Sequence, residues 1–206
     1  MSARPKRQVV VPLVVVAHAL LLWRWPARVD DPRLDAPDDV ERCSENLRAI
    51  YAGLLEYERR CGHAPSGAGT AFLAELFASG VWVDTPENRA RLTCPGPGAE
   101  RVRADVDYAR PATLGADDSA YAARDGVRFP LVKFPSGGAE LEALVACDNA
   151  HAANHDGCTN LLYSDGSVVV LVDAELVARG RLAAGVPRLL VGPDSPLPEL
   201  QKLTRE

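Results

Sequence analysis

The stretch that most constrains the fold is residues 160–172, where two strand-like runs flank a short turn. The runs cover residues 160–163 and 167–172, and Ser164-Asp165-Gly166 lies between them. Asp-Gly favours a type I′ turn, because both central residues of that turn need a positive φ, which glycine adopts readily. The second run is apolar and β-branched, which is typical of a strand packed in a core. The sequence therefore predicts a buried β-hairpin.

A long amphipathic helix is predicted over residues 39–60. Its apolar residues recur at spacings of three and four, which places them on one face, and Gly62 is positioned to end the helix. We expect this face to pack on the sheet of its own domain; the alternative is pairing with a partner helix in a filament. The stripe consists of Val40, Cys43, Leu47, Ile50, Leu54, Tyr57 and Cys61.

The remaining predicted elements are short. Helices are expected at residues 71–78, from Pro86 onward with Thr85 as the N-cap, and at residues 173–178. Strands are expected at residues 106–109, 127–133 and 141–147. A helix followed by an antiparallel sheet of late strands is an α+β order.

The N-terminal residues 1–28 predict a membrane anchor. Basic residues precede an apolar run at 9–23, which as a helix is about 24 Å long, close to the ~30 Å of a hydrocarbon core. The leading positive charges favour a cytoplasmic N-terminus and an extracytoplasmic head. The alternative is a cleaved signal peptide followed by secretion, because a signal peptide has the same charged start and apolar middle.

Three further regions follow this segment. Residues 29–39 form an acidic linker, in which five aspartates and two prolines favour a solvated, extended chain. Residues 40–185 form the predicted α+β head, and residues 186–206 form a Pro-rich tail.

The charge and the motifs narrow the classes of function. A net charge of −5 argues against nucleic acid as the main partner. The sequence contains no P-loop, no dinucleotide fingerprint and no Gly-x-Ser-x-Gly elbow, so we predict no cofactor and identify no small-molecule substrate.

Five cysteines are present, and none forms a Cys-x-x-Cys pair, which argues against a zinc ribbon or a thioredoxin-type centre. An exported location makes disulfides plausible. Cys147 and Cys158 bracket the lead-in to the hairpin and are the pair we would test first. The alternative is that some cysteines are small buried hydrophobic residues.

Candidate chemistry is concentrated before the hairpin, where Asp148, His151, His155 and Asp156 follow one another. Histidine and carboxylate side chains can bind a divalent metal, so Asp148, His151 and His155 are metal-site candidates. The interpretation that we favour is that His155 makes a structural hydrogen bond to the hairpin backbone or to Asp165. Asp165 precedes Gly166 and is assigned a turn role rather than a catalytic one. We therefore predict no metal.

Nine residues separate His155 from Asp165-Gly166, a spacing that resembles the H-X9-DG signature of pilin-like, prepilin-processing-associated proteins. The block around Asn160 is similar to the aromatic Asp-Gly core of that family. Three other blocks resemble the family too: Cys43-Ser-Glu-Asn-Leu-Arg-Ala-Ile50, Thr93-Cys94-Pro95, and Ala143-Leu-Val-Ala-Cys-Asp148. One departure is that no Gly precedes residue 53 and no Glu precedes Glu41, so a recognisable prepilin peptidase site is missing.

The resemblance implies a pilin-like fold, with an N-terminal membrane helix and a long helix packed on a small antiparallel sheet. It also implies a non-enzymatic structural role near type II secretion or type IV pilus-type machinery, with an inner-membrane anchor, a periplasmic head and protein partners. The alternative function is an exported metal-binding module or metal-dependent enzyme that uses Asp148, His151 and His155.

Overall fold

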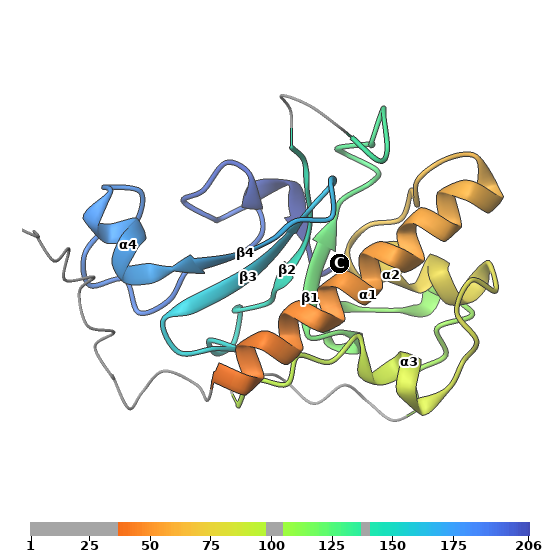
Figure 1. The fold of residues 1–206 in the computed structure, drawn as a ribbon, viewed down its shortest axis with the longest axis horizontal. Helices are drawn as coiled ribbons and strands as arrows, with labels where there is room; N and C mark the ends of the chain where they lie inside the picture. The colour runs from red at the N-terminus through yellow and green to blue at the C-terminus, as the bar shows by residue number, and fades with distance from the viewer. Residues whose placement is uncertain (1–36, 98–104, 137–140) are drawn as a thin grey trace, which may run out of the picture. The chain divides into compact units, whose positions relative to one another are not determined.

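The fold is taken from a computed structural model, which describes residues 37–97, 105–136 and 141–206 (Figure 1). The predicted anchor and residues 29–36 of the acidic linker lie outside the described residues. Among the helices that are described, none has the length and apolar character that crossing a membrane requires. The described residues belong to one compact unit, Pro32–Glu206.

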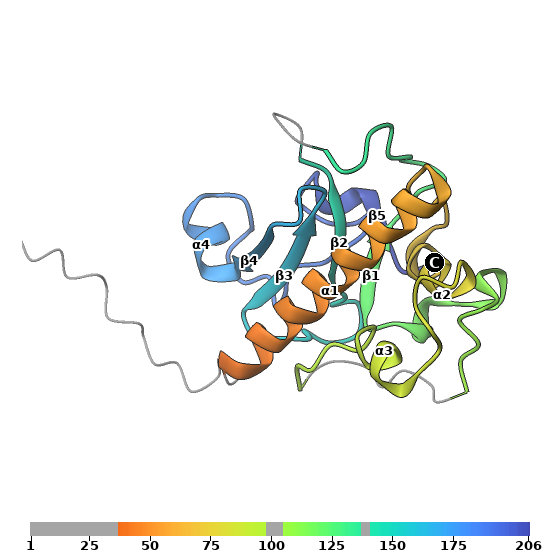
Figure 2. The ribbon, with the colours of Figure 1, turned by 45° about the vertical axis from the view of Figure 1, so that its right-hand side comes forward.

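A five-stranded antiparallel sheet organises the described residues, in the order β4-β3-β2-β1-β5 (Figures 1 and 2). In the central pairs, Tyr121 lies opposite Cys147, and Ala146 lies opposite Leu161. Together with the helices, this sheet makes the fold α+β. The strands are β1 (Tyr121–Arg124), β2 (Ala143–Cys147), β3 (Cys158–Tyr163), β4 (Val168–Val172) and β5 (Leu203–Thr204).

Two of the predicted strands are wrong. Residues 106–109 and 127–133 form turns and bends, and the first strand is β1, with the sequence Tyr-Ala-Ala-Arg. Strand propensity reflects how well a side chain fits a half-buried pleated surface, whereas both faces of β1 are buried. Alanines fit between two covered faces because they are small, but alanine has a low strand propensity, so the sequence gives little local indication of β1.

The long helix α1 (Pro37–Cys61) crosses one face of the sheet and contacts β3 and β4 (Figures 1 and 2). The predicted stripe is confirmed from Cys43 to Tyr57, whereas Cys61 at the end of the helix is exposed. The stripe therefore packs on the sheet of its own domain. The other helices are α2 (Gly69–Ala78), α3 (Pro86–Ala90) and α4 (Asp173–Ala178), with 3-10 turns at Pro111–Thr113, Ala116–Asp118 and Leu200–Lys202. In α3, the Thr85 side chain accepts the predicted N-cap hydrogen bond from the Asn88 amide, at 3.2 Å.

A second hydrophobic core covers the opposite face of the sheet. Residues 186–206, which the sequence sets apart as a Pro-rich tail, supply four of its fully or almost fully buried leucines and strand β5, which pairs with β1. The leucines lie between the prolines, so the segment turns repeatedly and still covers apolar surface. They are Leu189, Leu197, Leu200 and Leu203.

The hairpin differs from the prediction at its turn. The Tyr163 amide donates to the Ser167 carbonyl at 2.9 Å, and the Gly166 amide donates to the Tyr163 carbonyl at 3.0 Å, which makes a three-residue loop. Gly166 has a φ of +87°, and in the described parts of the chain no residue other than glycine has a positive φ. The type I′ turn is therefore wrong, because that turn needs two positive φ values. A type I turn closed by a left-handed glycine fits the observed hydrogen bonds.

Strand β4 is at the edge of the sheet, so the expectation of a core strand is also wrong. Val169 and Val170 are each 41% exposed, whereas Leu171 is buried in the second core and Val168 packs, partly buried, against the first. An edge strand has one unpaired side, and its apolar residues do not indicate that both faces are covered.

Candidate functional site

Four side chains that can bind a metal converge between α1 and the sheet. Cys43 belongs to α1, Cys94 to the loop after α3, Cys147 is the last residue of β2, and His155 precedes β3. Their potential ligand atoms all lie within 4.8 Å of one another. We call these four residues the Cys3His cluster.

The closest contacts within the cluster are short. Cys43 Sγ lies 3.3 Å from Cys147 Sγ and 3.7 Å from Cys94 Sγ. Cys94 Sγ lies 3.1 Å from His155 Nε2. All four residues are buried, so the cluster is a closed group in the interior of the domain.

Secondary structure brings Cys43 and Cys147 together. Cys43 is part of the apolar stripe of α1, which faces the sheet. Cys147 pairs in register with Tyr121, and the Tyr121 hydroxyl lies 3.6 Å from Cys43 Sγ. The same helix–sheet packing that forms the core therefore sets the distance between these two sulfurs.

Cys94 reaches the cluster through a tight turn that needs glycine. A Cβ atom on Gly96 would lie 1.9 Å from the Asn154 carbonyl oxygen and 2.7 Å from His155 Nδ1. The Cys94-Pro95-Gly96 turn thus packs directly against the loop that carries His155. A side chain on Gly96 would push the two ligand-bearing loops apart.

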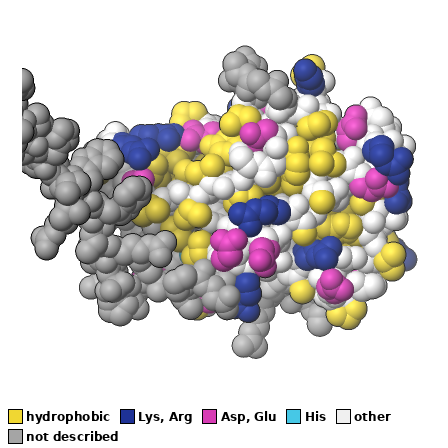
Figure 3. Space-filling view, viewed as in Figure 1, with side chains coloured by type: hydrophobic (Ala, Val, Ile, Leu, Met, Phe, Trp, Pro, Cys, Tyr) yellow, Lys and Arg dark blue, Asp and Glu magenta, His cyan; other side chains and the backbone are white. Residues whose placement is uncertain are grey.

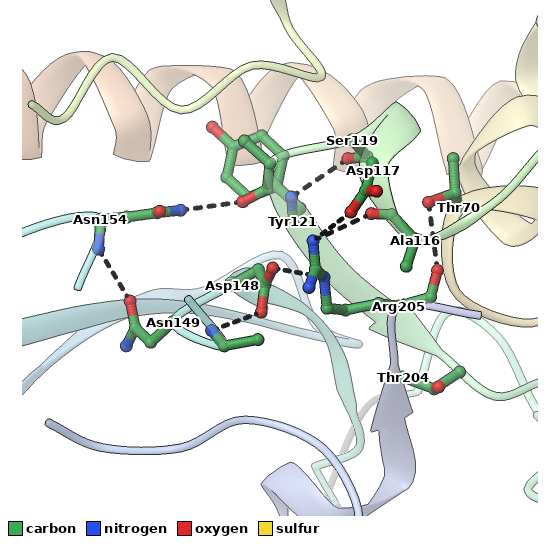
Figure 4. Close-up of polar contacts among 12 residues, drawn as sticks. Thr70, Ala116, Asp117, Ser119, Tyr121, Asp148, Asn149, Asn154, Thr204 and Arg205 are labelled. Atoms are coloured by element: carbon green, nitrogen blue, oxygen red, sulfur yellow. Dashed lines mark hydrogen bonds and ion pairs between the residues drawn. The ribbon is translucent and has the colours of Figure 1, made fainter. Parts of the chain in front are cut away.

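Buried asparagines hold the loop that presents His155. The backbone amide of Asn154 donates to Asn149 Oδ1 at 3.0 Å, and the side-chain Nδ2 of Asn154 donates to the Ala120 carbonyl at 2.9 Å (Figure 4). Asn149 Nδ2 also donates to Thr159 Oγ1 at 2.8 Å. These bonds tie the loop to Ala120, just before β1, and to β3, so tertiary contacts of Asn149 and Asn154 position His155.

The thiols of the cluster do not ionise alike. The Cys147 and Cys94 thiols donate toward Cys43 and lower the pKa of the Cys43 thiol well below its ordinary value. Desolvation by burial raises the pKa of the Cys147 thiol. The cluster thus favours a thiolate at Cys43, and the Asn160 side chain supports it with a further hydrogen bond.

The structure does not bring the predicted metal candidates into one group. Asp148 Oδ2 forms an ion pair with Arg205 Nε at 2.5 Å, and Asp148 Oδ1 accepts from the Ala150 amide (Figure 4). His151 is exposed. Of the three candidates, His155 alone belongs to a group of potential ligands among the described residues. Asp148 instead holds the C-terminal segment against β2. The fourth member of the run, Asp156, is exposed.

The motif residues of the hairpin lie in separate places. His155 precedes β3 and Asp165 follows it, so the six-residue strand separates them by about 20 Å. Of the two hydrogen-bond partners predicted for His155, Asp165 is therefore wrong, whereas the backbone at the start of the hairpin does pair with His155 in an antiparallel bridge at Cys158. Asp165 Oδ1 accepts from the Ser167 amide at 2.9 Å within the turn. Asn160 Nδ2 donates to the Val40 carbonyl at 3.0 Å, which ties β3 to α1.

The structure records all five cysteines as thiols. Cys147 faces Cys43 and Cys94, and Cys158 lies on β3 outside the Cys3His cluster. The predicted Cys147–Cys158 pairing thus finds no support in this geometry.

Sequence reasoning missed the Cys3His cluster, although it noted each member separately. One indication was available: the H-X9-DG spacing begins at His155, and each of the three other blocks that resemble the family contains one cysteine of the cluster. Such a group of buried thiols and an imidazole can bind a thiophilic metal, form a disulfide, or remain a network of hydrogen-bonded thiols.

Comparisons with known proteins do not choose among these chemistries. No family model, no curated protein and no solved structure matches this chain.

Proposed function

We propose that residues 37–206 form the extracytoplasmic head of a membrane-anchored, pilin-like structural protein, which acts with type II secretion or type IV pilus-type machinery. In this proposal the protein is not an enzyme. The apolar segment at residues 9–23 holds the chain in the inner membrane, and the head makes contacts with other proteins.

The observation that carries the proposal is the packing of α1. This 25-residue helix follows the N-terminal segment and lays one apolar stripe along an antiparallel sheet. A helix-first α+β head of this kind is what the resemblance to pilin-like proteins implies. The turn at Gly166, part of the H-X9-DG signature, also packs on α1 through Tyr51, whose hydroxyl donates to the Ser164 carbonyl at 3.4 Å.

This packing limits how the protein makes partner contacts. Leu47, Ile50 and Leu54 are fully buried inside the head, so α1 has no apolar stripe left for a partner helix. Figure 3 shows charged side chains of both signs among apolar ones on the face that α1 covers. Contacts of the head with partners would therefore use this mixed surface, and the apolar contact between subunits would come from the N-terminal segment.

The alternative function, a metal site built on Asp148, His151 and His155, has no geometric support, because Asp148 is paired with Arg205 and His151 is exposed. We therefore propose the structural role rather than this metal-dependent function.

Cys61 provides a direct test of topology, because it is exposed while the other four cysteines are buried. A maleimide that cannot cross membranes should label Cys61 in spheroplasts that express the full chain, and should not label the Cys61→Ser variant. The mature protein should also retain residues 9–23 when its N-terminus is determined by mass spectrometry. Labelling that requires lysis of the spheroplasts would show that the head is cytoplasmic and would overturn the proposal.

A further inference from the structure

We propose that Cys43, Cys94, Cys147 and His155 bind one zinc ion in a closed, structural site. This inference concerns the interior of the head and does not depend on the proposed function.

The donor set is the first argument. Three thiolates and one imidazole are one of the ligand combinations of structural zinc sites, which are four-coordinate and tetrahedral. A catalytic zinc site keeps one position open for water, whereas here four protein ligands fill the coordination sphere. All four side chains are also shielded from solvent. The site therefore suits a structural ion rather than a catalytic one.

The distances are the second argument. With Zn–S bonds of about 2.3 Å and a Zn–N bond of about 2.0 Å, a tetrahedral site has S···S edges near 3.8 Å and S···N edges near 3.5 Å. The Cys43–Cys94 sulfur distance is 3.7 Å, the Cys43–Cys147 distance is 3.3 Å, and the Cys94–His155 distance is 3.1 Å. No pair of ligand atoms exceeds 4.8 Å. Movements of about 1 Å or less would bring all four atoms to a zinc ion at the centre.

The surroundings of the sulfurs are the third argument. Zn²⁺ with three thiolates and a neutral imidazole carries one net negative charge, which buried hydrogen-bond donors must stabilise. The Gly96 amide donates to Cys94, and the Asn160 side chain donates to Cys43. The Tyr121 hydroxyl, 3.6 Å from Cys43 Sγ, is a further donor. The cluster thus has the outer hydrogen bonds that thiolate ligands require.

A zinc ion at this position would join four separate segments of the head. It would link α1, the loop after α3, the end of β2 and the loop before β3. The competing outcome is a disulfide between Cys43 and Cys147, whose sulfurs would have to approach from 3.3 Å to about 2.05 Å. That disulfide would use up two of the four ligands, so Cys94 and His155 could no longer bind zinc together with Cys43 and Cys147. Measuring the metal content and mapping the disulfides therefore distinguishes a zinc site from a disulfide.

The first experiment uses the full-length wild-type chain, purified in detergent without chelators. We expect about one zinc per chain by elemental analysis, and release of that zinc when a mercurial reagent blocks the thiols. After the zinc is removed, addition of Co²⁺ should give the ligand-field bands of tetrahedral cobalt with sulfur-to-cobalt charge transfer. Zinc-free protein that gives no charge-transfer band with Co²⁺, or a native Cys43–Cys147 disulfide, would overturn the proposal.

The second experiment uses matched variants. Cys94→Ala and His155→Ala should lose the bound zinc and lower the affinity for Co²⁺ by more than about tenfold. Cys158→Ala and His151→Ala change the same residue types outside the cluster and should keep one zinc per chain. Full zinc occupancy in Cys94→Ala would overturn the assignment. If the ligand variants do not fold, the wild-type cobalt spectrum alone decides the outcome.

A chelator supplies the third readout. Removal of the ion should lower the denaturant midpoint of the wild-type chain and of Cys158→Ala, because binding to the folded state alone stabilises it. The midpoint of Cys94→Ala should not respond to the chelator. An equal response in all three proteins would mean that the chelator acts elsewhere, which would count against the site.

Discussion

The substitution Gly166→Ala adds a single methyl group and tests how tightly the hairpin turn packs against α1. The φ of Gly166, +87°, lies in the left-handed region, and a Cβ there would meet the Tyr51 ring at 2.5 Å. Gly166→Ala therefore imposes two separate costs. One is the backbone conformation itself, and the other is the overlap with a side chain of α1.

The two costs have different magnitudes. A left-handed conformation costs a residue with a β-carbon about 1–2 kcal/mol. Overfilling a packed contact typically costs about 1–3 kcal/mol more, because the Tyr51 ring must move. Tyr51 is held by an edge-on contact with Phe134, with ring centroids 5.9 Å apart, and by the bond from its hydroxyl to the Ser164 carbonyl. We therefore expect Gly166→Ala to destabilise the head by about 2–5 kcal/mol in total.

Gly180→Ala is the matched control, because Gly180 has a φ of +67° and no atom within 4 Å of the position that a Cβ would take. It should cost about 1–2 kcal/mol, which measures the backbone term alone. Chemical denaturation at a constant zinc concentration gives both values from the shift in midpoint. In a double-mutant cycle, Tyr51→Ala should remove most of the additional cost of Gly166→Ala. Equal losses in Gly166→Ala and Gly180→Ala would refute the claim that the turn packs on α1.

Three further substitutions test the core and the two ion pairs of Glu142. Leu47→Ala and Leu54→Ala should each lower the free energy of unfolding by about 2–5 kcal/mol, since both side chains are fully buried; unchanged denaturant midpoints would mean that the stripe of α1 is exposed in solution. Burial alone would raise the pKa of Glu142, but hydrogen bonds from Lys202 and Arg124 outweigh it and lower the pKa. A lowered pKa stabilises the fold above the unfolded value of about 4.3, and this stabilisation is lost as the pH falls through the folded pKa. Glu142→Gln should therefore cost about 1–3 kcal/mol at neutral pH and progressively less below about pH 4.5, and a constant difference from pH 7 to pH 3 would contradict this.

Sequence predicts well those parts of the fold that a pattern of neighbouring residues determines. The stripe of α1 repeats every three or four residues, so the pattern alone predicts both the helix and its buried face. Strand β1 carries no such pattern. Its two central alanines are buried because neighbouring strands and helices cover them, and that covering depends on segments far away in the chain.

The candidate site was hidden for a similar reason. The residue numbers of Cys43, Cys94, Cys147 and His155 differ by 51, 53 and 8 in turn, whereas zinc motifs are recognised from cysteines whose numbers differ by three to five. The packing of α1 on the sheet brings Cys43 to Cys147, and the packing of two loops, at Gly96 and Asn154, adds Cys94 and His155. The acidic and basic residues that follow one another near His155 looked more like a site, yet Asp148 pairs with Arg205 and His151 is exposed.

The Asp165-Gly166 pair correctly predicts a hairpin turn but does not decide its length. The pair fits a two-residue turn and a three-residue loop equally well. The register of the strands decides between them, because Leu162 pairs with Val168 and the Tyr163 amide bonds to the Ser167 carbonyl.

The position of β5 has a consequence for how this chain is synthesised. All four members of the Cys3His cluster precede residue 156, whereas Leu200, Leu203 and β5 belong to the last seven residues. Ribosomes add about 5–20 residues per second, so Leu203 follows the end of β4 by roughly 2–6 s. Until then the face of the sheet that carries Leu161 and Leu171 lacks the part of its cover that Leu200 and Leu203 supply. A premature stop codon between residues 173 and 200 would therefore release a chain that has every proposed zinc ligand but exposes an apolar surface that promotes aggregation.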